Sequence, residues 1–158
     1  MKTSRTKDKD IFARRPVVEL RASLNRLDIA AEADVAGLET FMEATIAAAM
    51  IIAHADGTAD AAERRRILSL FRASPLLQRF SADDISREIA AHSIAFERDH
   101  QSAFAHARAQ IVVTDLSSKQ FGALMNVCVC VLEADGVRHP AEELALEQIS
   151  LLRPWGYR

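Results

Sequence analysis

The chain has 158 residues, a length that fits one domain, and 49% of them are apolar, which is enough for a sizeable core. Its formal net charge is −2, so no overall positive field draws it to nucleic acid. Aromatic residues make up only 6%, with four prolines and five glycines. This composition favours helices packed through small side chains and argues against a β-sandwich.

The N-terminal segment is basic. Residues 1–15 carry six basic and two acidic side chains and few apolar ones, which predicts a solvated, flexible tail before a helical domain at 16–158. The alternative is a basic arm that touches an acidic lipid or partner surface. No apolar run follows this start as it would in a signal peptide, and the longest near-apolar stretch, Ala44–Ala55, has twelve residues, too few to span a bilayer.

Helical periodicity recurs along the rest of the chain. It predicts helices over 17–27, 34–55, 61–72, 81–92, 99–113, 117–134 and 140–152. Ser81 is a candidate N-cap, Ser117 and Gln120 form a capping box, and Pro140 holds the favoured first position of the last helix. The helices at 34–55 and 117–134 become apolar nearly all round, which indicates central positions. We expect an all-α, single-domain helical bundle of about seven to eight helices.

Two stretches of the chain match each other. "HADGTADAAERRRI" follows the first long apolar helix, and "EADGVRHPAEEL" follows the second. Asp56, Gly57 and Glu63 stand 79 positions before Asp135, Gly136 and Glu142. The match predicts an approximate internal two-fold repeat of helical hairpins, one in each half of the bundle.

The matched turns allow two interpretations. In the structural one, each glycine ends a helix, Asp60 or His139 caps the next, and Glu63 or Glu142 completes the cap. This leaves Asp56 and Asp135 unexplained, because a carboxylate at a helix C-terminus is mildly unfavourable. In the other, the acids bind a hard divalent cation, with histidine nitrogens tilting the preference towards transition metals. The candidate ligands are Asp56, Asp60, Glu63, Asp135, Glu142, His54 and His139, with Glu143 beside them.

These same stretches resemble the paired signature of the tellurite resistance TerB family and its TerB-like domains. The resemblance covers roughly residues 35–152. It implies a bundle of about seven helices whose clustered acidic positions bind divalent metal, here Asp56, Glu63, Asp135 and Glu142. It also implies a role in stress resistance to tellurite, near the inner membrane and with membrane-associated partner proteins. In this chain the basic run Arg64–Arg66 corresponds to Glu143–Ala145 in the second copy, so the halves differ in charge.

From these observations we expect a cytoplasmic protein, without a transmembrane segment, that is not an enzyme. No catalytic elbow, phosphate loop or zinc-protease motif occurs. The preferred function is a TerB-like stress-resistance module that binds divalent cations at its two Asp-Gly turns. The alternatives are a metal-independent module that docks a basic partner through the acidic turns, and a metal-dependent hydrolase. We interpret Arg64–Arg66 as a solvated helix face, His92, His100 and His106 as polar residues, and Cys128 and Cys130 as buried apolar ones.

Overall fold

A computed structural model describes residues 35–73, 80–134 and 136–153, and within these ranges every regular element is a helix. The helices are α2 (Val35–Ala53), α3 (Ala61–Arg72), α4 (Ala82–Arg98), α5 (His100–Val113), α6 (Ser118–Glu133) and α7 (Pro140–Ser150). The predicted all-α bundle is confirmed, with six helices in the described part of the chain. The predicted tail at 1–15 and the predicted helix at 17–27 lie outside it, and so does residue 34, where the next helix was predicted to begin.

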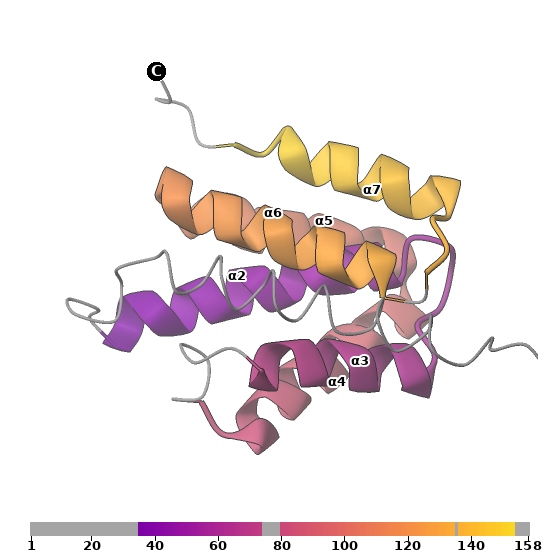
Figure 1. Ribbon diagram of the computed structural model, residues 1–158, viewed down its shortest axis with the longest axis horizontal. Helices are drawn as coiled ribbons and strands as arrows, with labels where there is room; N and C mark the ends of the chain where they lie inside the picture. The colour runs from indigo at the N-terminus through magenta and orange to yellow at the C-terminus, as the bar shows by residue number, and fades with distance from the viewer. Residues whose placement is uncertain (1–34, 74–79, 135, 154–158) are drawn as a thin grey trace, which may run out of the picture.

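Helix α2 is the centre of the bundle. It packs against α3, α4, α5, α6 and α7. From Ala44 to His54 every side chain is buried, and the alanines among them are between 0 and 4% exposed. Because the side chains of α2 are small on all sides, five helices can pack closely against it. The apolar run that the sequence places in a buried helix is therefore the core of the molecule (Figure 1).

Side-chain caps set the starts of the surrounding helices. Asp60, Ser81, Asp99 and Ser117 each accept a hydrogen bond from the backbone N–H three residues ahead. The predicted capping box of Ser117 is confirmed, since the Gln120 side chain also accepts the Ser117 N–H at 2.9 Å. Each cap satisfies amides that the first helical turn leaves unpaired.

One predicted boundary is wrong. Helix α4 does not end near His92 but continues to Arg98, and only Asp99 separates it from α5. The buried face of α4 runs on through Ser93 to Phe96, so packing keeps this part helical. Asp99 has extended backbone angles, φ −156° and ψ 97°, and its side chain caps α5. A single extended residue that also caps the next helix is enough to turn the chain.

The two hairpins, α2–α3 and α6–α7, lie side by side and run in the same sense. Figure 1 shows the connection from α2 to α3 and the connection from α6 to α7 at the same end of the bundle. Helix α6 packs on α2, α3 and α7, with Cys128 and Cys130 buried as predicted. Among the described residues, no helix is long and apolar enough to cross a membrane.

Candidate functional site

The two turns share one backbone hydrogen bond and a glycine with positive φ. Gly57 donates its N–H to the His54 carbonyl and Gly136 donates to the Glu133 carbonyl, both at 3.0 Å. Gly57 has φ +132° and Gly136 φ +76°, in the region that favours glycine. The donors stand 79 positions apart, and so do the acceptors. The repeat read from the sequence is therefore also a repeat of this hydrogen bond.

In the first turn, Asp60 and Glu63 cap α3 reciprocally. The Glu63 N–H donates to Asp60 Oδ1 at 2.8 Å, and the Asp60 N–H donates to Glu63 Oε2 at 2.7 Å. This is the predicted capping pair. Each carboxylate uses one oxygen in these two bonds, which leaves Asp60 Oδ2 and Glu63 Oε1 outside the cap.

In the second turn, Glu142 takes the place of Glu63. Its Oε2 accepts the His139 N–H at 3.4 Å, while Pro140 opens the helix as predicted. The Glu142 side chain is buried, with 6% of the residue exposed, although it carries a carboxylate. Burial of a charged group is costly unless polar or charged groups surround it, so this end of the bundle must supply them.

Glu63 and Glu142 come together in one cavity. The cavity, of about 20 Å³, lies between the two hairpins, and we call it the acidic corner. Its lining consists of Ala53, Glu63, Arg66, Ile67, Leu70, Val131, Ala134 and Glu142. It has room for about one water molecule or a small ion. The sequence left open whether the two turns lie close together. In the structure, Glu63 of the first turn and Glu142 of the second line the same cavity.

Arg66 is the residue of the acidic corner that sequence reasoning missed. Arg66 is exposed, as predicted for the arginine run, but it also lines the cavity with the two glutamates. A signal was present, because Glu63, Arg66, Ile67 and Leu70 follow the i, i+3, i+4, i+7 spacing of one helical face. Arg66 is thus a basic residue in a lining that also includes two acidic ones.

The structure describes only one of the two aspartates that precede the turn glycines. Asp56 is exposed at the end of α2 and makes no hydrogen bond or ion pair with any described residue. Asp135 lies outside the described residues. Glu143 is exposed on α7, and His139 is half-buried at its N-cap.

His54 is part of the core beneath the first turn. It is 1% exposed, and its Nδ1 accepts the Ala59 N–H at 3.3 Å. The ring stacks on Phe96 with centroids 4.6 Å apart and planes at 5°, and His100 Nε2 lies 2.9 Å from the His54 carbonyl oxygen. Burial lowers the pKa of His54. Since Nδ1 already holds the turn together, a cation could bind there only by breaking that bond.

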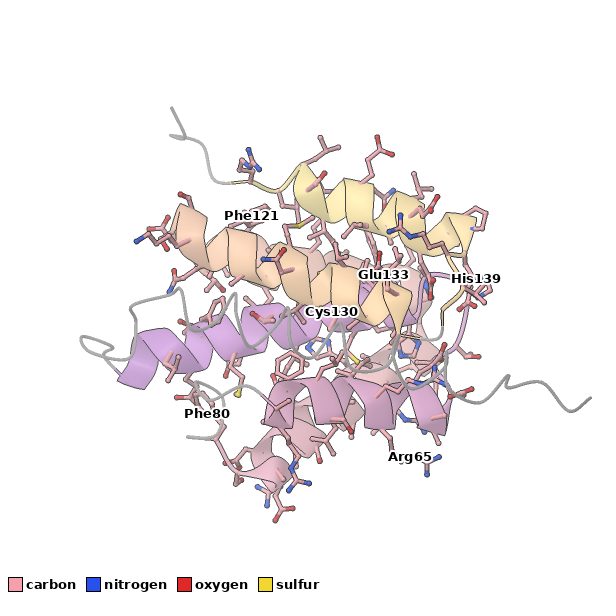
Figure 2. All side chains as sticks on the ribbon, viewed as in Figure 1. Arg65, Phe80, Phe121, Cys130, Glu133 and His139 are labelled. Atoms are coloured by element: carbon pink, nitrogen blue, oxygen red, sulfur yellow. The ribbon has the colours of Figure 1, made fainter. Side chains whose placement is uncertain are left out.

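The described residues contain no group of three or more histidine, cysteine, aspartate or glutamate side chains placed to hold one metal ion. The carboxylates of the acidic corner are a pair. Carboxylate oxygens are groups that a hard cation prefers, so these two side chains are the ones that could hold such an ion. Figure 2 shows Glu133 and His139 towards this same end of the bundle, where the two hairpins turn.

The structure thus defines a class of protein: an all-α module of two like hairpins that places an acidic residue from each half in one corner. Residues 42–152 match the family described as tellurite resistance protein TerB, and the chain belongs to that family. No curated protein and no solved structure matches the chain significantly.

Proposed function

We propose that this protein is a non-catalytic TerB-family module that binds a divalent cation at the acidic corner and acts in resistance to tellurite or a related stress. The observation that supports the proposal is the convergence of Glu63 and Glu142, one from each hairpin, on a single cavity. Each glutamate caps its own helix, and this role does not require it to lie near the other glutamate. Capping therefore does not explain why both side chains line one cavity.

The cation would be held by the two glutamate carboxylates, with water oxygens as its further ligands. Calcium takes six to eight oxygens, and magnesium keeps several of its waters, so two protein carboxylates with water suit a magnesium-like ion of modest affinity. Arg66 offsets part of the negative charge before the ion arrives. In this role, the ion would join the two halves of the bundle.

Calorimetry and thermal unfolding with Ca²⁺, Mg²⁺, Mn²⁺ and Zn²⁺ test the proposal. A ligand that binds only the native state at one hundred times its Kd stabilises it by about 2.7 kcal/mol. The chain with Glu63→Gln and Glu142→Gln should lose this response. Glutamine preserves the capping geometry while removing the charge, so the fold should survive.

The matched control is Glu143→Gln, on the same helix but exposed and outside the cavity. It should respond to the cation as the unmodified chain does. A cation response that persists in the double variant would place the site elsewhere, and no response to any of the four ions would reject cation binding.

A metal-independent module is the second candidate, because one oxygen each of Asp60, Glu63 and Glu142 is already engaged by backbone amides. In that case the acidic turns would dock a basic partner protein. Pull-downs with the intact chain and with Asp56→Lys, which reverses an exposed charge of the first turn, distinguish the two functions when made in buffer with a chelator. A partner retained without metal and lost on charge reversal favours docking.

A further inference from the structure

The basic run on α3 borders a groove that the acidic corner does not use. The groove lies between α3 and α4 and has a volume of about 250 Å³, against about 20 Å³ for the acidic corner. Its lining consists of Ala61, Arg64, Arg65, Leu68, Ser86, Ile89 and Ala90. The α3–α4 groove thus combines an apolar floor with two guanidinium groups.

The two arginines differ in what they already bind. Arg64 Nη1 donates to the Ala59 carbonyl at 3.0 Å and lies 3.9 Å from Glu97 Oε1, so its charge is partly compensated. Arg65 is exposed, and its guanidinium makes no hydrogen bond or ion pair with any described residue. Figure 2 shows Arg65 pointing away from the bundle, on the α3 side. The groove therefore offers an uncompensated positive charge.

A complementary surface lies on α7. Helix α7 packs on α2 and α6 through Ala145 and Ile149, and its outer face is formed by Glu143, Leu144, Glu147 and Leu151. Leu144 is 55% exposed and Leu151 is 78% exposed. Leu151 is the C-cap residue of α7 and stands seven positions after Leu144, so the two leucines lie on the same side with Glu147 between them. We call this the α7 outer face, an acidic surface with two exposed leucines.

We propose that the α7 outer face of one copy docks in the α3–α4 groove of a second copy of this chain. The leucines would enter the apolar floor against Leu68 and Ile89, and the glutamates would face Arg65. The groove lining combines apolar side chains with arginines and contains no acidic residue. The α7 outer face combines two leucines with glutamates, so the two surfaces carry opposite charges. This charge complementarity selects a second copy as the occupant.

The contact would be heterologous. In Figure 1, α7 and the α3–α4 pair lie on opposite sides of the bundle, with α2 and α6 between them. One copy therefore cannot place its own α7 in its own groove, and two copies that dock this way each keep one free surface. Such an interface joins copies head to tail, in an open chain or in a ring of more than two copies, and does not form a two-fold dimer.

Sedimentation velocity across a wide concentration range tests the proposal. The full chain should show a mass that rises beyond that of a dimer, and added salt should reduce it because screened charges attract less. Arg65→Glu and Glu147→Arg should each abolish the rise when studied alone, since each faces its partner surface with a like charge. Both residues are exposed, so circular dichroism should show an unchanged helical content for either variant.

The decisive sample is the equimolar mixture of these two variants. Each supplies the surface that complements the other, so the mixture should associate although neither variant does so alone. Arg98→Glu, on the exposed side of α4 outside the groove, is the control and should associate like the unmodified chain. A chain that stays monomeric at every concentration, association that survives Arg65→Glu, or a mixture that remains monomeric would each overturn the proposal.

Discussion

At the scale of single residues, buried histidines couple this fold to pH. His92 is 8% exposed, on the inner face of α4, and burial lowers its pKa from 6.5 to about 4, with a smaller contribution from His106. His54 shifts in the same direction, also mainly through burial. Both rings are held neutral inside the bundle, where they pack as part of the core.

The lowered pKa of His92 makes the folded protein less stable at acidic pH. Between pH 6.5 and about 4 the unfolded state binds a proton at His92 that the folded state does not, so the free energy of unfolding falls as the pH falls. A shift of this size corresponds to at most about 3 kcal/mol. In His92→Leu, urea unfolding followed across this window should show a shallower loss of stability. An equally steep loss in both proteins would mean that His92 titrates normally.

At the scale of elements, replacing glycine by alanine should change the free energy of unfolding in opposite directions in the α2–α3 turn and inside α6. Gly57 has φ +132°, and a Cβ there would meet no atom within 4 Å, so only the backbone conformation opposes a side chain. Gly57→Ala should therefore destabilise the protein by about 1–3 kcal/mol. Gly122, inside α6, is equally open but lacks a positive φ, and Gly122→Ala should stabilise by about 0.5–1 kcal/mol. Urea unfolding of both variants measures whether each free energy of unfolding falls or rises.

The elements also show what sequence can and cannot predict here. Asp60, Ser117 and Pro140 act locally, so their roles in starting helices were predicted from residues a few positions away. The end of α4 was not, because Phe96 stays helical through contacts with His54, forty-two positions earlier. The repeat predicted two like turns, but the meeting of Glu63 and Glu142 depends on how the hairpins lie against each other. That arrangement is set by tertiary packing.

At the scale of the whole molecule, the bundle depends on how closely its helices approach α2. Ala47, Ala48 and Ala49 are successive residues, all 0% exposed, so they point to different sides of α2 and meet different neighbours. An alanine on each side sets the distance at which a neighbouring helix can pack. The acidic corner sits at one end of this arrangement, where Ala53 of α2 contributes to its wall.

Enlarging one of these alanines should therefore affect stability and the corner together. Ala48→Leu adds a branched side chain where the core has no free space, and overpacking of this kind costs about 1–3 kcal/mol. Ala105→Leu, on the exposed side of α5, adds the same atoms and should change the free energy of unfolding by no more than about 0.5 kcal/mol. Urea unfolding of the two variants gives the comparison.

Because α2 packs against α3, α6 and α7, which carry the acidic corner, the cation response proposed above should also weaken in Ala48→Leu and persist in Ala105→Leu. Equal stability of the two variants would show that the core accommodates the larger side chain, and that small residues along α2 do not set the spacing of the bundle.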